Sequence, residues 1–118
     1  MGEITDYLKK STEKAIKAGV EKEFIVIDPG IGFGKTAEDN YKIMKNLSEL
    51  KALGMPIMIG TSRKSFLGHV LGNPQKDRLS ATVASVSIAA LNGADIVRVH
   101  DVNYIKDALQ ITDAVKNS

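Results

Sequence analysis

The sequence contains no cysteine, which excludes disulfide bonds and thiolate zinc sites and is typical of a cytoplasmic protein. Aromatic residues make up only 5% of the chain, so platforms that stack nucleic-acid bases are not expected. Lysine and glutamate are mixed, the net charge is only +2, and no basic run indicates a nucleic acid or a membrane surface as partner. No apolar stretch approaches the length of a membrane span. With 118 residues and 43% hydrophobic content, the chain is the size of one ordinary globular domain.

Helix and strand signals alternate along the chain. Four consecutive apolar residues at 24–27 are typical of a strand that is covered on both faces in a parallel sheet. We predict strands at residues 24–28, 57–60 and 95–100, and helices at 4–18, 37–53, from about 63, at 80–92 and at 105–115. Within this pattern Gly19, Gly54 and Gly93 end helices, and Ser62 is the N-cap of the helix near Arg63. The second helix turns four apolar residues inward (Ile43, Met44, Leu47 and Leu50). Gly72-Asn73-Pro74 breaks the pattern of helices and strands.

The predicted architecture is incomplete as a closed α/β fold. A (β/α)8 barrel needs eight strands and about 250 residues, whereas only three strands are predicted here. Three parallel strands alone also leave two unprotected sheet edges. We therefore expect residues 1–118 to form part of a larger domain.

The most informative segment is residues 27–35, which read Ile-Asp-Pro-Gly-Ile-Gly-Phe-Gly-Lys. Asp28 ends the first strand, and the three glycines allow a ligand to approach the backbone closely. The segment is not a P-loop, because Gly34-Lys35-Thr36 matches its last positions but Pro29 stands where the first glycine is required. The dinucleotide pattern also fails, since Lys35 takes the place of its third glycine. A merely tight strand-to-helix turn remains the structural alternative.

The other two strands also end in polar residues. Residues 60–65 read Gly-Thr-Ser-Arg-Lys-Ser at the start of a helix, where backbone N–H groups favour an anion. Arg98 and His100 alternate along the third strand, so they share a face and could hold one anionic group. Each also has an ordinary interpretation: Lys64 as a solvated helix lysine, Arg98 as an ion-pair partner of Asp28, and His100 as a partner of a carbonyl. The remaining polar residues nearby are expected to be structural (His69, Asp95, Asp101).

Three strings together resemble bacterial dihydropteroate synthase. They are residues 28–35, residues 60–66 (Gly-Thr-Ser-Arg-Lys-Ser-Phe) and residues 94–102 (Ala-Asp-Ile-Val-Arg-Val-His-Asp-Val). The order and spacing are those of the family, and the similarity extends across essentially the whole chain. The resemblance implies an α/β fold that is the C-terminal part of a (β/α)8 TIM barrel, with strands six to eight and their helices.

The family condenses p-aminobenzoate with 6-hydroxymethyl-7,8-dihydropterin diphosphate in folate biosynthesis, releasing pyrophosphate, and is the target of sulfonamide drugs. The resemblance implies that Asp28 accepts hydrogen bonds from the pterin and that Lys64 donates to it. It implies that Arg98 lies on the pterin face and, with His100, holds the departing diphosphate. It assigns p-aminobenzoate to Phe33, Arg63, Lys64 and Ser65, counts Gly32 among the substrate-binding residues, and gives the catalytic roles to Lys64, Arg98 and His100.

Other parts of the family's site have no counterpart in this sequence. The asparagine associated with Mg²⁺, two mobile loops and further pterin contacts belong to earlier strands, so no metal ligand is expected in this chain. We predict that the 118-residue chain alone is inactive and self-associates, whereas the full-length family forms homodimers. The alternatives are a pterin-binding methyltransferase that acts on a corrinoid and a non-catalytic assembly module.

Overall fold

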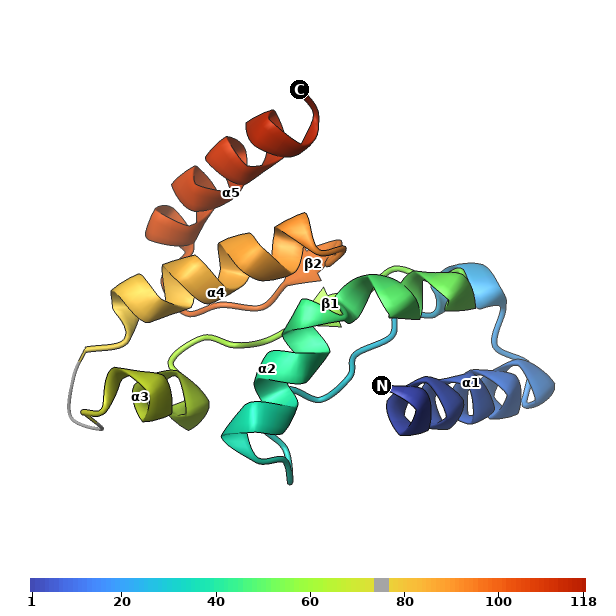
Figure 1. The fold of residues 1–118 in the computed structure, drawn as a ribbon. Coiled ribbons are helices and arrows are strands. Elements are labelled where there is room, and N and C mark those ends of the chain that lie inside the picture. The colour runs from blue at the N-terminus through green and yellow to red at the C-terminus, as the bar shows by residue number, and fades with distance from the viewer. Residues whose placement is uncertain (74–76) are drawn as a thin grey trace.

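The computed structural model describes residues 1–73 and 77–118. The elements, in chain order, are α1 (Gly2–Lys17), the 3₁₀ turn η1 (Lys22–Phe24), α2 (Ala37–Lys45), the 3₁₀ segment η2 (Leu47–Leu53), β1 (Met58–Ile59), α3 (Ser65–Leu71), α4 (Leu79–Leu91), β2 (Ile96–Val97) and α5 (Val102–Lys116) (Figure 1). The predicted alternation is present for the second and third strands, whereas residues 24–28 form no strand element. The N-terminus is at the start of α1, and the C-terminus is at the end of α5, which packs on α4.

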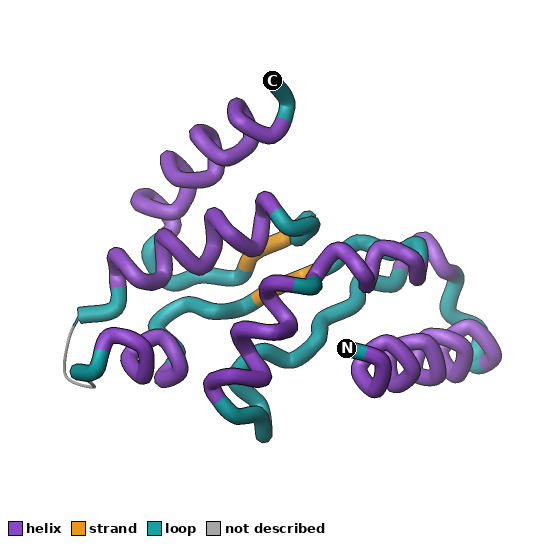
Figure 2. The backbone as a smooth tube through the Cα atoms, viewed as in Figure 1, coloured by secondary structure: helices purple, strands orange, loops and turns teal. Residues whose placement is uncertain are grey.

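A short parallel sheet lies at the centre of the molecule (Figure 2). β1 pairs with β2 in the register Met58–Ile96 and Ile59–Val97. On the other side of β1, Ile27 forms a single parallel bridge with Ile57. Three parallel segments therefore run side by side, and each is shorter than the strand predicted from the sequence.

The prediction of a strand over residues 24–28 is wrong in extent. Phe24 ends the 3₁₀ turn η1 and is 76% exposed, and Val26 is 45% exposed. Only Ile27 is buried, and its main chain donates to the Pro56 carbonyl and accepts from the Met58 amide. The apolar run is thus covered on one face only: Ile25 and Ile27 pack on the core, whereas Phe24 and Val26 face outward.

The predicted helix over residues 37–53 is divided in two. Asn46 separates α2 from η2, and its side-chain amide donates to the Lys42 carbonyl at 2.9 Å. Such local side-chain bonds compete with the regular helical ladder. The inward-facing residues are nevertheless those predicted, since Ile43, Met44, Leu47 and Leu50 are all buried. Gly54, at φ +79°, ends η2 as predicted.

Ser62 is not a helix N-cap, contrary to the sequence prediction. α3 begins at Ser65 with Lys64 at the N-cap position, and no side chain caps it. The hydroxyl of Ser62 is instead bonded to His100. The predicted break at Gly72-Asn73-Pro74 lies partly outside the described residues, because Pro74 is not among them; Gly72 ends α3.

The core lies between the sheet and the helices that follow each strand. It consists of buried apolar residues from α1, α2, η2, β1, α3 and α4 and from the segments between them (including Leu8, Ile27, Ile31, Ile43, Leu47, Leu50, Ile57, Ile59, Phe66 and Ala89). This packing holds the three strand ends, and the loops that follow them, on one side of the molecule. No helix in the described parts of the chain is both long and apolar enough to cross a bilayer.

Candidate functional site

The glycine loop after Asp28 is closed by its own polar groups. The amide of Gly30 donates to Asp28 Oδ1 at 2.7 Å, which leaves most of this exposed carboxylate accessible. Lys35 Nζ donates to the carbonyls of Gly30 at 3.0 Å and Phe33 at 3.2 Å. Thr36 then caps α2 in a capping box with Asp39. Lys35 and Thr36, which matched the end of a P-loop, therefore have structural roles in this loop.

Gly32 is required where the loop meets the second strand end. Its backbone has φ +86°, and its amide donates to Oδ1 of the buried Asn40 at 2.9 Å. A Cβ at this position would lie 2.9 Å from Cδ of Lys64. A larger residue would therefore strain the backbone and displace the Lys64 side chain.

Lys64 lies across the glycine loop. Its Nζ donates to the Ile31 carbonyl at 2.6 Å and lies 4.7 Å from the centroid of the Phe33 ring. Partial burial lowers the pKa of the Lys64 ammonium from its ordinary value, the charges of Arg98 and Lys35 lower it further, and the carboxylate of Asp28 acts in the opposite direction. Lys64 is therefore not the solvated helix lysine that was the ordinary alternative.

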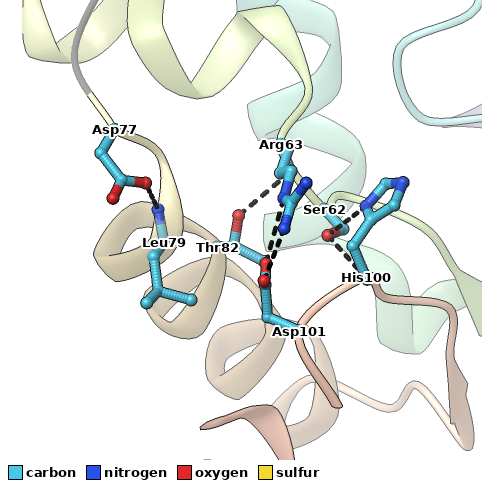
Figure 3. Close-up of polar contacts among 7 residues, drawn as sticks. All are labelled: Ser62, Arg63, Asp77, Leu79, Thr82, His100 and Asp101. Carbon is cyan, nitrogen blue, oxygen red and sulfur yellow. Dashed lines mark hydrogen bonds and ion pairs between the residues drawn. The ribbon is translucent and has the colours of Figure 1, made fainter. Parts of the chain in front are cut away.

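Arg63 joins the second strand end to the third (Figure 3). Its Nε and Nη2 donate to the two carboxylate oxygens of Asp101 at 3.1 and 2.6 Å. Its amide donates to Thr82 Oγ1 at 3.1 Å, and its backbone has φ +56°, the only positive value for a non-glycine residue among those described. The two hydrogen bonds from Arg63 lower the pKa of the Asp101 carboxyl, and the same contact raises the pKa of Arg63.

His100 contacts a hydroxyl, not the carbonyl that the sequence suggested as its ordinary partner. Its Nδ1 lies 2.8 Å from Ser62 Oγ, and its amide donates to the same oxygen at 3.1 Å (Figure 3). The third strand end is thus attached to the second through two neighbouring pairs, Ser62–His100 and Arg63–Asp101.

Arg98 has an exposed side chain on a fixed backbone. Its amide donates to the Ile59 carbonyl at 3.0 Å, and its Cβ lies 4.0 Å from the position that a Cβ on Gly60 would take. Within residues 1–73 and 77–118 it forms no ion pair with a carboxylate, so the alternative of a structural Arg98–Asp28 pair is wrong. Its guanidinium is near enough to influence the Lys64 ammonium.

Ser65 lies at a cavity beside the glycine loop. It is the exposed first residue of α3 and lines a cavity of about 500 Å³, together with Gly32, Lys35, His69 and Arg78. His69, expected to be ordinary, lies 3.6 Å from Glu38, and both side chains are exposed. The structure thus brings Gly32, Phe33 and Lys64 close together, and Ser65 lines a cavity that Gly32 also lines.

Sequence reasoning missed Asn40 and Thr82. Asn40 is 1% exposed and holds the glycine loop, and Thr82 is fully buried and holds the Arg63 backbone. Asn40 had a readable signal, because it lies at helical spacing from Ile43, Met44 and Leu47 on the apolar face of its helix. Asp95, expected to flank its strand, does so by accepting from the Ile57 amide at 3.0 Å.

Comparisons with known proteins agree with one another. Residues 1–100 match the family described as pterin binding enzyme. The dihydropteroate synthase of Clostridium beijerinckii is 47% identical over 116 residues, which cover 98% of this chain and 43% of the relative. That of Bacillus subtilis is 44% identical over 110 residues, covering 93% of this chain and 39% of the relative. The chain therefore spans about two-fifths of the length of these curated relatives.

Solved structures show the same likeness. The Yersinia pestis dihydropteroate synthase in complex with a sulfonamide drug superposes with a TM-score of 0.94 at 38% identity, over 99% of this chain and 43% of that one. A clostridial dihydropteroate synthase crystallised in the presence of pteroic acid gives a TM-score of 0.91 at 50% identity, over 98% of this chain and 44% of that one.

Proposed function

This chain belongs to the pterin-binding enzyme family, and we propose that it is the part of a dihydropteroate synthase that holds the pterin and the leaving group. The proposed reaction joins p-aminobenzoate to 6-hydroxymethyl-7,8-dihydropterin diphosphate and gives 7,8-dihydropteroate and pyrophosphate. One observation carries the proposal. A carboxylate, Asp28, and two cations, Lys64 and Arg98, stand at the carboxyl ends of three neighbouring parallel segments, and Lys64 Nζ and Arg98 Cβ lie 3.7 and 4.0 Å from the place of a Cβ on Gly60.

We further propose that the chain is a partial domain, strands six to eight of a (β/α)8 barrel with their helices. The three parallel segments, each followed by helix, support this assignment. So do TM-scores above 0.9 with synthases of which this chain covers 43% and 44%. The remaining strands of the site would come from the part of the relatives that this chain does not cover.

The geometry of Lys64 suits the pterin-binding role. An ammonium group has three N–H donors, and the Ile31 carbonyl takes one of them. Two donors remain for the carbonyl and a ring nitrogen of a pterin. The exposed carboxylate of Asp28 can accept two parallel hydrogen bonds from the amino-pyrimidine edge of the same ligand.

The chemical step is an alkyl transfer, in which the protein positions substrates and stabilises charge. The bond between the exocyclic methylene carbon and the diphosphate oxygen breaks, and the diphosphate leaves with the electron pair. The arylamine nitrogen of p-aminobenzoate forms the new bond and loses a proton. Arg98, which forms no ion pair within the described residues, and His100 would bind the departing anion.

The p-aminobenzoate ring would lie against Phe33, which is 68% exposed and whose ring centroid lies 4.7 Å from Lys64 Nζ. The aliphatic parts of Arg63 and Lys64 would cover its other edge, and the Ser65 hydroxyl would donate to its carboxylate. Sulfonamide drugs would compete for the same place. This role for Ser65 is supported by its exposure beside Gly32.

Mg²⁺ is not assigned to this chain. Among the described residues there is no group of three histidine, aspartate or glutamate side chains that could hold a metal ion. The described side chains of this chain therefore do not fit a Mg²⁺ site, and the steps proposed here do not use a metal. We propose that the residue that binds Mg²⁺ lies in the part of the enzyme that this chain does not cover. A cytoplasmic location also stays a proposal, supported by the cysteine-free sequence.

An exchange experiment tests the function. The aligned segment of a curated synthase is replaced by this chain, and p-aminobenzoate-dependent release of pyrophosphate is measured. We expect turnover from the hybrid and none from the 118-residue chain alone. Lys64→Ala and Arg98→Ala in the hybrid should each lower kcat/KM by roughly 10²-fold or more, whereas Lys10→Ala, on the exposed surface of α1, should not.

The alternatives predict other outcomes. Methyl transfer to a corrinoid without pyrophosphate release would identify a methyltransferase. A soluble hybrid with neither activity would favour the third hypothesis, a non-catalytic assembly module. Near-normal turnover of Lys64→Ala or Arg98→Ala would contradict the assignment of these two cations.

A further inference from the structure

The hydroxyl of Ser62 is committed entirely to His100. It accepts the His100 backbone N–H at 3.1 Å and lies 2.8 Å from imidazole Nδ1. Ser62 is 5% exposed, so water cannot easily replace either contact. It does not cap α3, and no other partner of its oxygen occurs among the described residues.

Counting donors and acceptors determines the direction of the ring contact. A serine hydroxyl has one proton to donate and two lone pairs. One lone pair accepts the His100 amide, and in the part of the chain that the structure describes imidazole Nδ1 is the only acceptor within hydrogen-bond distance of the hydroxyl. If Nδ1 carried the proton instead, the buried hydroxyl would have no acceptor for its own, which is unfavourable. The neutral imidazole therefore has a bare Nδ1 and a protonated Nε2.

We propose that Ser62 is a positioning residue that fixes the neutral His100 ring as the Nε2–H tautomer, with its N–H on the side opposite Ser62. This inference rests on the proposed function, in which His100 binds the departing diphosphate. An anion needs an N–H donor at Nε2 and would be repelled by a bare nitrogen lone pair. The backbone contact also fixes the place of His100 at the strand end.

A merely structural role for a buried hydroxyl makes different predictions, and Ser85 provides the matched control. Ser85 is also 5% exposed, and its hydroxyl contacts Thr61 Oγ1 at 2.7 Å and the Thr82 carbonyl at 2.8 Å. Ser85→Ala removes a comparable group without touching His100. Ser62→Thr keeps the hydroxyl and should rescue the effect of Ser62→Ala.

The first test is long-range ¹H–¹⁵N NMR of the ¹⁵N-labelled chain at about pH 8.5, where histidine rings are mostly neutral. His69→Gln assigns the two histidines. In the wild type, Ser62→Thr and Ser85→Ala, we expect His100 Nε2 to resonate as a protonated nitrogen and Nδ1 as a bare one. In Ser62→Ala the two shifts should move toward each other. A wild-type ring protonated at Nδ1, or an unchanged Ser62→Ala spectrum, would overturn the proposal.

The second test uses the active hybrid enzyme. Ser62→Ala should lower kcat roughly fivefold, the loss expected for one hydrogen bond, and leave the KM for p-aminobenzoate unchanged. Ser85→Ala and Ser62→Thr should retain kcat. An unchanged kcat in Ser62→Ala would overturn the role of Ser62 in the reaction. A hybrid without turnover would overturn only the proposed function, because the NMR measurement does not depend on activity.

Discussion

At the scale of single residues, the position of Lys64 depends on the missing side chain of Gly32. The aliphatic part of Lys64 passes so close to Gly32 that a Cβ there would lie 2.9 Å from Lys64 Cδ. The lysine stem is flexible, so an added methyl group would displace it and leave the backbone in place. Its ammonium would then lose the Ile31 carbonyl and the Phe33 ring.

Gly34 is the matched control for a Gly32→Ala substitution. Gly32 and Gly34 both have positive φ, +86° and +63°, but a Cβ on Gly34 has nothing within 4 Å. Alanine at either position should cost about 1–2 kcal/mol of unfolding free energy from backbone strain. Only Gly32→Ala should also abolish the ring-current shift that Phe33 imposes on the Lys64 side-chain protons, measured by NMR. Equal loss or equal retention of this shift in the two variants would contradict the argument.

The Arg63–Asp101 pair should make stability depend on acidity. The pKa of the Asp101 carboxyl is lowered in the folded chain, so the folded state binds fewer protons at this site than the unfolded state does. The pair therefore stabilises fully above the ordinary carboxyl pKa of about 3.9, and this contribution is lost as the pH falls through the lower folded value.

Urea unfolding of the wild type and Asp101→Asn should reveal this dependence. We expect the variant to be less stable at pH 7 and the difference to shrink below about pH 4. Because the Arg63 side chain is 57% exposed, 1 M salt should reduce the difference at pH 7. A difference that is the same at pH 3 and pH 7 would show that Asp101 acts through packing and not through its charge.

At the scale of elements, α2 should depend on its capping box. Thr36 Oγ1 accepts the Asp39 amide at 3.1 Å, and the Asp39 carboxylate accepts the Thr36 amide at 3.2 Å. Thr36→Ala should lower the unfolding free energy by about 1 kcal/mol, measured by chemical denaturation. Ser11→Ala, an exposed hydroxyl inside α1, should be neutral or slightly stabilising because alanine is the better helix former. Equal effects of both changes would contradict the capping role.

The helices were more predictable than the strands because helix signals are local. Gly54 and the spacing of Ile43, Met44, Leu47 and Leu50 gave the inward face and the end of the second helical region. The break at Asn46 was not predicted, since it depends on a single hydrogen bond from the Asn46 side-chain amide to the Lys42 carbonyl. The first strand was overestimated, because a strand extends only where neighbours pair with it, and an apolar run such as residues 24–27 does not reveal them.

The site was predictable in its location but not in its connections. Asp28, Lys64 and Arg98 could be placed together because the carboxyl ends of parallel strands meet at one edge. The contacts of Ser62 with His100 and of Arg63 with Thr82 join residues 38 and 19 positions apart. No spacing rule within one element predicts such pairs, so Ser62 was interpreted as a helix cap.

At the scale of the whole molecule, the chain is more open than a closed domain. Its radius of gyration is 14.9 Å, compared with about 13.5 Å for a compact domain of this length. Large apolar side chains are exposed at the outer side of the sheet and on the helices (Phe24, Val26, Ile96, Tyr104, Ile111 and Val115). Such surfaces and unpaired strand edges favour association with other chains.

We therefore expect the isolated 118-residue chain to self-associate through the edge beside Ile27. Light scattering after size exclusion should give a mass that rises with concentration. Phe24→Lys combined with Val26→Lys should reduce this rise, since lysine on a sheet edge opposes strand addition. Tyr104→Lys removes a 63% exposed aromatic from α5 and serves as the control. A constant monomer mass for the wild type would contradict the prediction. An equal effect of Tyr104→Lys would show that the chain associates through its exposed apolar surface in general and not through the sheet edge.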